Sequence, residues 1–252
     1  MDFKDLSVVV TGAGGGIGAA LVTGFGAAGA RVIGCDVTDS AMNALPLAGR
    51  VAFDLTDPAS IRAGAAGLLA AHGVPDVVVM NAGWTRGESF AAMDADAVGH
   101  EIDLNLTGVA RLTHAFLAPM RARGAGAFVF VSSVNALAHF GNPAYAAAKA
   151  GILALMRAVA TEAGRDGVRA NAVCPGSVRT PAWDHRIDRD PSIPETLAGL
   201  YPLGRIVTPA EVTAAVMFLA SRQASGITGQ TLAVDAGLTA GNVPFIRDIL
   251  GE

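Results

Sequence analysis

Short runs of apolar residues alternate along this chain with longer segments whose apolar positions follow a helical period. Each short run is continuously apolar, as expected of strands that are buried on both faces of a parallel sheet. We predict strands of this kind at residues 7–10, 31–35, 51–53, 77–80, 127–131, 168–173 and 231–234.

The segments between these strands predict helices. Asp57 followed by Pro58 is typical of a helix N-terminus, and Gly29 is typical of a C-terminal cap. We expect helices at residues 17–28, 57–72, 94–123, 143–164 and 209–220. The alternation indicates an α/β fold with helices on both faces of the sheet. Because no linker, repeat or low-complexity segment interrupts it, residues 1–252 are expected to form a single domain.

Residues 177–207 break this alternation. The stretch is rich in Pro, Arg and Asp and shows no steady apolar period. Irregular stretches of this length are uncommon as simple connections and usually serve as lids or binding loops. We therefore expect residues 177–207 to form a substrate loop.

Composition narrows the class of protein. The chain of 252 residues is 52% apolar and only 16% charged, which indicates that part of its surface is buried in an oligomer. A net charge of −4 offers no basic surface, so no nucleic-acid partner is expected. Cys35 and Cys174 are too few for a disulfide framework and are expected to be reduced, buried thiols in the cytoplasm.

Residues 6–30 carry no formal charge and are numerous enough to span a bilayer. However, the stretch contains eight glycines and changes from a β-branched run to a small-residue helical pattern. The acidic residues 1–5 also lack the positive region of a signal peptide. We expect no membrane span, no signal peptide and a cytoplasmic location.

A glycine cluster separates the first predicted strand from the first predicted helix. Gly12, Gly16 and Gly18 would let the backbone approach a pyrophosphate, and the helix N-terminus would offer free N–H groups. Asp36 ends the second strand 18 residues after Gly18, close to the spacing of a carboxylate that binds the adenosine ribose. Asp54 ends the third strand, at an edge that can receive adenine. A carboxylate repels a 2′-phosphate and the glycine turn has no arginine, so the pattern favours NAD; no metal site is expected.

Tyr145 and Lys149 are one helical turn apart and therefore project from the same face. The chain has only two tyrosines and two lysines, and its other cations are arginines, which keep their charge. A nearby ammonium lowers the pKa of a phenol, as a group that exchanges a proton near neutral pH requires. The pair therefore predicts a site of proton transfer.

Together these motifs resemble those of the classical short-chain dehydrogenase/reductase family over nearly the whole chain. The matching pieces are the glycine turn, Asp54-Leu55, Asn81-Ala82-Gly83, Asn105, Ser132-Ser133, Tyr145 with Lys149, and Pro175-Gly176 followed by Val178 and Thr180. The resemblance implies a Rossmann-type, doubly wound, seven-stranded parallel sheet flanked by helices, in a homotetramer. Met80 and Ala136 replace the family's frequent Asn and Gly without removing a reacting group.

The resemblance also implies catalytic roles. Tyr145 would donate and accept the proton, and Lys149 would lower its pKa and hold the nicotinamide ribose. Asn105 would hold a water that relays protons. Ser133 would bind the substrate oxygen, because it aligns better than Ser132, which is then a structural strand-end residue. The implied cofactor-binding residues are Gly12, Gly16, Ile17, Gly18, Asp36, Asp54, Leu55, Asn81, Ala82, Gly83, Tyr145, Lys149, Pro175, Gly176, Val178 and Thr180.

Candidate substrate-binding residues follow these motifs or lie in the substrate loop. They are Trp84, Asn135, His139, Arg179 and Trp183, with Arg86, Phe140, Ser177, His185 and Arg186 as further candidates. The arginines suit a carboxylate, sulfonate or phosphate, unless they are solvated or paired with nearby aspartates. The expected reaction interconverts a small polar secondary alcohol, of sugar, polyol or hydroxy acid type, and its ketone by hydride transfer.

Three alternatives remain open from the sequence. The first is an NADP(H)-dependent carbonyl or 3-oxoacyl-type reductase. The second is a catalytically inactive nucleotide sensor on the same fold, which would not need Tyr145, Lys149, Ser133 and Asn105 together. The third is an S-adenosylmethionine-dependent methyltransferase, which would leave those residues and Asn81-Ala82-Gly83 unexplained.

Overall fold

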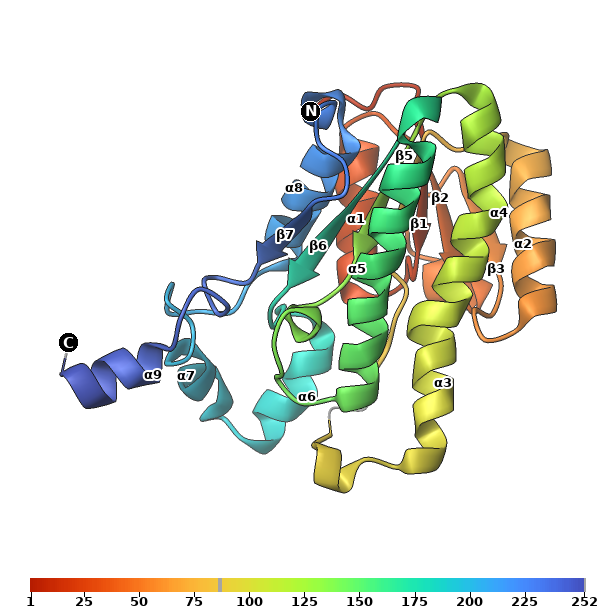
Figure 1. Ribbon diagram of the computed structural model, residues 1–252. Helices are drawn as coiled ribbons and strands as arrows, with labels where there is room; N and C mark the ends of the chain where they lie inside the picture. Colours follow the sequence, from red (N-terminus) through yellow and green to blue (C-terminus); the bar gives the residue numbers. More distant parts are fainter. Residues whose placement is uncertain (86–87, 252) are drawn as a thin grey trace.

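Seven parallel strands form one sheet in the computed structural model, which describes residues 1–85 and 88–251 (Figure 1). The strand order is β3-β2-β1-β4-β5-β6-β7, which confirms the predicted doubly wound parallel sheet. Residue 86 and the side chains of residues 182 and 184–186 are not described, so the predictions on Arg86, His185 and Arg186 lie outside the described part of the protein. The strands are β1 (Ser7–Thr11), β2 (Arg31–Asp36), β3 (Gly49–Ala52), β4 (Val77–Met80), β5 (Gly126–Val131), β6 (Val168–Pro175) and β7 (Thr231–Val234).

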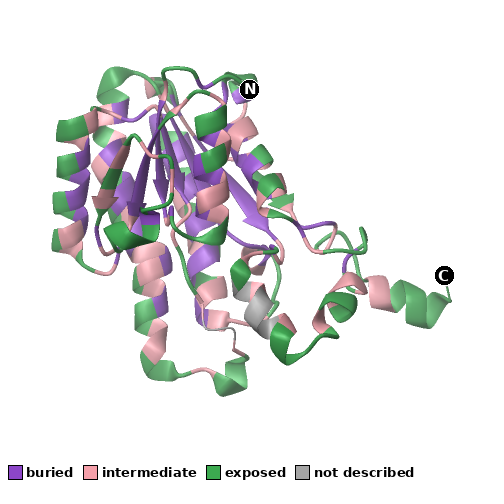
Figure 2. Ribbon diagram, turned by 180° about the vertical axis from the view of Figure 1, so that it is seen from behind, coloured by how far each residue is buried: buried purple, intermediate pink, exposed green. Residues whose placement is uncertain are grey.

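Helices cover both faces of the sheet (Figure 1). One face carries α1 (Gly16–Ala27) and α8 (Pro209–Ala220), and the other carries α2 (Pro58–His72), α4 (Gly108–Arg123) and α5 (Pro143–Ala163). Successive strand residues point to opposite faces, so the apolar residues of the central strands pack into one core or the other. Val8 and Val10 thus pack toward α1 and α8, whereas Val9 packs toward α2, α4 and α5. Figure 2 shows the buried residues gathered in the sheet and on the helix sides that face it.

The helix predicted over residues 94–123 is interrupted in the structure. A 3₁₀ turn at Ala95–Ala97 leads into α3 (Val98–Ile102), and a π-helical turn at Asp103–Thr107 joins α3 to α4. Asp94 caps the start, where its carboxylate accepts a hydrogen bond of 3.0 Å from the Asp96 amide. Turns of π-helix inside longer helices occur frequently at functional sites. Asn105 lies in this one.

The prediction that residues 177–207 form an irregular loop is wrong in one respect, because the segment contains two helices. These are α6 (Pro181–Arg189) and α7 (Ile193–Ala198), which lie beyond the carboxyl ends of the strands (Figure 1). None of their described residues is buried, and both helices are short with few apolar residues, so the sequence carries little signal for them. A parallel bridge between Val178 and Val207 joins the two ends of the segment.

Other element boundaries differ from the predictions by one or two residues. Helix α1 begins at Gly16, and β3 covers Gly49–Ala52 because its register with β2 pairs Gly49 with Ile33. At the C-terminus, α9 (Val243–Phe245) continues into a π-helical turn at Ile246–Leu250. Short 3₁₀ turns complete the elements at Asp39–Met42, Phe90–Ala92, Val134–Ala136, Gly164–Asp166 and Arg222–Ala224.

One helical stretch, Pro143–Asp166, is long and apolar enough to cross a bilayer. In this fold it is the core helix α5 with the 3₁₀ turn that follows it, and 44% of its most apolar window is buried inside the protein. Its buried residues include the charged Lys149 as well as Ile152 and Met156. Packing in the core therefore accounts for its apolar character.

Candidate active site

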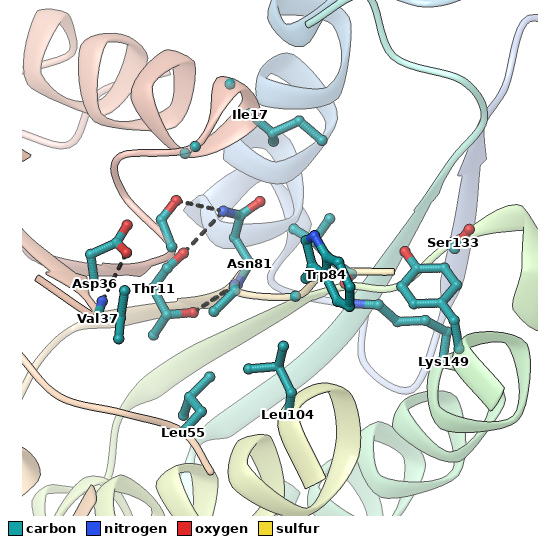
Figure 3. Close-up of a pocket in the computed structure, with 18 of the residues that line it drawn as sticks. Thr11, Ile17, Asp36, Val37, Leu55, Asn81, Trp84, Leu104, Ser133 and Lys149 are labelled. Atoms are coloured by element: carbon teal, nitrogen blue, oxygen red, sulfur yellow. Dashed lines mark hydrogen bonds between the residues drawn. The ribbon is translucent and has the colours of Figure 1, made fainter. Parts of the chain in front are cut away.

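A cavity of about 690 Å³ lies where the strands end, as expected for ligand sites in open α/β sheets. All sixteen residues predicted to bind the cofactor line this cavity, from Gly12 to Thr180. Ser133 and Trp84 line it as well. Figure 3 shows Asp36 at one end of the cavity and Ser133 and Lys149 at the other. The site is therefore elongated, with different chemistry at its two ends.

Several positions from the end of β1 into the start of α1 require glycine. Gly12 has a φ of 63°, a left-handed conformation that L side chains rarely adopt. A side chain at Gly18 would overlap the Gly12 carbonyl, and one at Gly16 would lie 2.7 Å from Cβ of Thr180. No side chain caps the start of α1, so its first N–H groups remain available to an anionic ligand.

Asn81 and Thr11 hold the ends of β4 and β1 together. The Asn81 side chain donates to the carbonyls of Thr11 at 3.0 Å and Gly12 at 3.2 Å. In return, the Thr11 hydroxyl accepts from the amides of Asn81 and Ala82, both at 3.0 Å. These bonds, drawn in Figure 3, fix the floor of the cavity between its two ends.

Asp36 is held in place by backbone amides. One carboxylate oxygen accepts from the Gly14 amide at 2.9 Å, and the other accepts from the Val37 amide at 2.8 Å. The acid at the end of β2 is thereby tied to the glycine turn across 22 residues of sequence. At this place in the cavity wall, the Asp36 carboxylate is positioned to accept hydrogen bonds from the hydroxyls of a bound ribose.

Asp54 and Leu55 form the wall beyond the end of β3. The Asp54 carboxylate accepts from the amide and the hydroxyl of Thr56, both at 2.7 Å. These two hydrogen bonds lower the pKa of Asp54, and the charge of His100 lowers it further. A carboxylate stays ionised here, beside the apolar side chain of Leu55, which lies next to Leu104 in Figure 3.

The proton-transfer end is built on α5 and the end of β5. Lys149 is buried and donates to the Val131 carbonyl at 3.0 Å, and its Nζ lies 5.4 Å from the centre of the Tyr145 ring. The Ser133 hydroxyl acts on Tyr145 by lowering the pKa of its phenol. Ser132 instead donates to the Lys149 carbonyl at 2.9 Å. Of the two serines, Ser133 is therefore the one that acts on Tyr145, whereas Ser132 braces α5.

Burial dominates the electrostatics of this pair. Desolvation raises the pKa of Tyr145 to about 12, which outweighs the lowering by the Ser133 hydrogen bond. Desolvation likewise lowers the pKa of Lys149 to about 8, since the interior disfavours an ammonium. The sequence prediction that Lys149 brings the Tyr145 pKa below its ordinary value therefore does not hold in this structure, where loss of water is the larger effect.

Asn105 is fully buried, and its side-chain amide is hydrogen-bonded to other parts of the protein. Its side-chain N–H groups donate to the carbonyls of Trp84 at 2.8 Å and Glu101 at 2.9 Å, and its oxygen accepts from the Trp84 amide at 3.1 Å. A methyl group added at Gly83 would lie 2.7 Å from that oxygen and 3.0 Å from the Lys149 nitrogen. Asn105 thus holds the strand end at residues 83–84 against Lys149. Because both of its side-chain N–H groups already donate to carbonyls, a proton-relay water would have to hydrogen-bond to another atom.

Four of the predicted substrate residues do not line the cavity. Asn135 forms hydrogen bonds within its own loop. Its backbone N–H donates to the Ser133 hydroxyl, and its side-chain N–H donates to the Gly141 carbonyl. His139 and Arg179 are exposed, and Trp183 on α6 is partly buried. Among the candidate substrate residues whose side chains the structure describes, Trp84 is the one that lies in the cavity wall, with 51% of its surface exposed.

Several lining residues escaped the sequence prediction. Thr11, Phe53 and Thr56 flank predicted motif residues and could have been found by that proximity. His100 and Leu104 are less obvious, because they come from a helix that the sequence places alongside the sheet. The sequence feature that could have revealed them is their spacing of four residues, which puts both side chains on one helix face. The others are Gly15, Cys35, Val37, Val131 and Ser132.

Comparisons with known proteins relate the chain to oxidoreductases. A family model described as enoyl-(acyl carrier protein) reductase matches residues 12–239. An uncharacterised oxidoreductase of Schizosaccharomyces pombe is 38% identical over 97% of this chain and 95% of its own length. A cis-4-hydroxycyclohexanecarboxylate dehydrogenase of Sinomonas cyclohexanicum is 38% identical over 94% of this chain and 98% of its own.

A solved structure extends the likeness to the whole fold. The crystal structure of an oxidoreductase from Burkholderia thailandensis matches with a TM-score of 0.92 and 42% identity, over 99% of this chain and 98% of that one. That protein is described as a member of the short-chain dehydrogenase/reductase family. With the seven-stranded sheet and the lined cavity, these matches show that the chain is an oxidoreductase of the classical short-chain dehydrogenase/reductase family.

Proposed function

We propose that this protein is an NAD-dependent dehydrogenase that interconverts a small polar secondary alcohol and its ketone. The observation that carries the proposal is one cavity that joins Asp36 to Tyr145, Ser133 and Lys149. The Asp36 end suits an adenosine ribose, and the Tyr145 end suits proton transfer to and from an alcohol oxygen. Family membership removes the methyltransferase alternative, since the family carries out nicotinamide chemistry.

The choice of NAD rests on the charges near Asp36. A 2′-phosphate bound there would face a carboxylate held by two amides. Arg50, on the neighbouring β3, is occupied because its guanidinium donates to the carbonyls of Met42 and Leu45, both at 3.3 Å. The described lining residues include no arginine, and their one lysine is Lys149 at the far end.

A nicotinamide cofactor bound in this cavity would supply the hydride chemistry between the alcohol and the ketone. Tyr145 takes the hydroxyl proton during oxidation, and Ser133 hydrogen-bonds the same oxygen. Because burial favours the neutral phenol, positive charge beside it is needed to stabilise the phenolate. Lys149 supplies such a charge and would also bind the nicotinamide ribose. Asn105 holds residues 83–84 in place beside Lys149.

We propose a small hydroxy acid as the substrate, and the name of one relative supports this choice. The Sinomonas relative is named for the oxidation of an alicyclic hydroxy acid, cis-4-hydroxycyclohexanecarboxylate. In this chain the indole of Trp84 offers an apolar surface beside the proton-transfer end. We propose that residues 177–207, including α6 and α7, cover the bound substrate. We further propose a homotetramer in the cytoplasm.

The proposal is tested by following NADH absorbance with a panel of hydroxy acids, sugars and other secondary alcohols, each with NAD⁺ and with NADP⁺. We expect turnover with NAD⁺ and little with NADP⁺. Preference for NADP⁺ would support the carbonyl reductase instead. Binding of NADH without turnover on any alcohol or ketone would favour the inactive sensor.

A further inference from the structure

His100 lines the cavity although no motif includes it. It lies on α3 with an exposed side chain and belongs to the same helix face as Leu104, four residues later. Leu104 points into the cavity beside Leu55 in Figure 3. The residues from α3 and the π-helical turn therefore form a wall that faces the end of β3.

The opposite wall comes from β3 and the residues that follow it. Phe53, Asp54 and Leu55 all line the cavity there. The charge of His100 contributes to lowering the pKa of Asp54, which places the imidazole within electrostatic reach of that carboxylate. His100 and Asp54 thus stand at one end of the cavity, away from Tyr145.

The identity of this end follows from the proposed function, on which the inference rests. Nicotinamide must lie at Tyr145 for hydride and proton transfer to occur together, and Asp36 suits the ribose of the other nucleotide. The adenine ring, attached to that ribose, then falls between the Asp54-Leu55 wall and the wall made by His100 and Leu104.

We propose that His100 is a cofactor-binding residue that covers the adenine ring opposite Leu55. An imidazole is flat and polarisable, and stacking of aromatic side chains on bases contributes measurably to nucleotide affinity. The role is binding alone, because His100 lies at the end of the cavity remote from the reacting oxygen.

The test compares two reduced cofactors by calorimetric titration. NADH carries adenine, whereas reduced nicotinamide mononucleotide lacks the whole adenosine half. For His100→Ala we expect NADH affinity to fall about tenfold, toward the lower end of the range for loss of one stacking contact, with unchanged affinity for the mononucleotide. His100→Phe keeps a flat ring and should retain most of the NADH affinity.

His114→Ala is the matched control, because His114 is an exposed histidine on α4 that does not line the cavity. It should bind both cofactors as the wild type does. Unchanged NADH affinity in His100→Ala would overturn the inference, and so would an equal loss for both cofactors, which would indicate a general disturbance. Failure of the wild type to bind NADH would overturn the proposed function itself and this inference with it.

Discussion

Tyr145 shows how burial and charge compete at one side chain. Its side chain is partly buried in the cavity wall, and the cost of removing the phenolate from water exceeds the stabilisation that Ser133 gives to it. The sequence correctly predicted that Tyr145 and Lys149 lie one turn apart on the same helix. The direction of the pKa shift was not accessible that way, since burial is a property of the surroundings.

Replacement of Tyr145 by Phe removes the hydroxyl and keeps the ring. We expect turnover to fall about 10²–10⁴-fold, the usual contribution of a general acid or base. NADH affinity should be nearly unchanged, because the glycine turn and Asp36 remain. Steady-state rates and NADH titration together check this prediction, and wild-type turnover in Tyr145→Phe would contradict the assigned role.

Glu101 is buried on α3, and its negative charge raises the pKa of Tyr145. Glu101→Gln removes that charge in nearly the same shape, so the Tyr145 pKa should fall. Oxidation requires the phenolate and rises with pH through this pKa, so the rising limb of its pH–rate profile should move to lower pH. Glu162→Gln, an exposed change on α5, should leave the profile in place. A shift to higher pH in Glu101→Gln would show that its carboxylate acts in another way.

Asp36 is the residue on which cofactor choice depends in our proposal. Asp36→Asn keeps an oxygen for hydrogen bonding but removes the charge that repels a 2′-phosphate. The preference for NAD⁺ over NADP⁺, measured as the ratio of kcat/KM values, should fall by about tenfold, equivalent to about 1.4 kcal/mol. Asp39→Asn changes an exposed carboxylate nearby that does not line the cavity, and should leave the ratio unaltered. An unaltered ratio in Asp36→Asn would remove the argument for NAD.

Helix α2 offers a comparison at the scale of the element. Gly64 and Gly67 lie one turn apart on it, but a methyl group at Gly64 would lie 2.6 Å from the Phe53 ring, whereas nothing lies within 4 Å at Gly67. Gly67→Ala should raise the free energy of unfolding by about 0.5–1 kcal/mol, since alanine loses less backbone entropy in a helix. Gly64→Ala should lower it by about 1–3 kcal/mol through overpacking. Urea unfolding measures both, and equal effects would contradict the packing described here.

The elements that sequence patterns predicted well are those that pack on the sheet. Strands β1, β4 and β5 are continuously buried, and α5 has an apolar side that fills the core. Helices α6 (Pro181–Arg189) and α7 (Ile193–Ala198) were missed because they are short and carry few apolar residues. The π-helical turn around Asn105 was also missed, since its hydrogen bonds to Trp84 come from a distant strand end.

At the scale of the whole molecule, β7 is the last strand of the sheet. Its residues Thr231, Leu232 and Ala233 are exposed, which suits burial against a second copy in the proposed homotetramer. Leu232→Arg should therefore reduce the sedimenting mass, because a charge in an apolar interface must be desolvated. Ala66→Arg, an exposed change on α2, should leave the mass unchanged. A monomeric wild type would contradict the proposed assembly.

The sequence by itself determined the sheet, the glycine turn and the residues that meet at the carboxyl edge of the strands. It could do so because these features depend on local periodicity and on the spacing of residues after consecutive strands. Only the tertiary structure decided that Ser132 braces α5 while Ser133 faces Tyr145, and that Asn135 serves its own loop. It also brought His100 from a distant helix to the cavity wall. These outcomes depend on packing between segments far apart in the chain, which determines burial, partners and pKa values together.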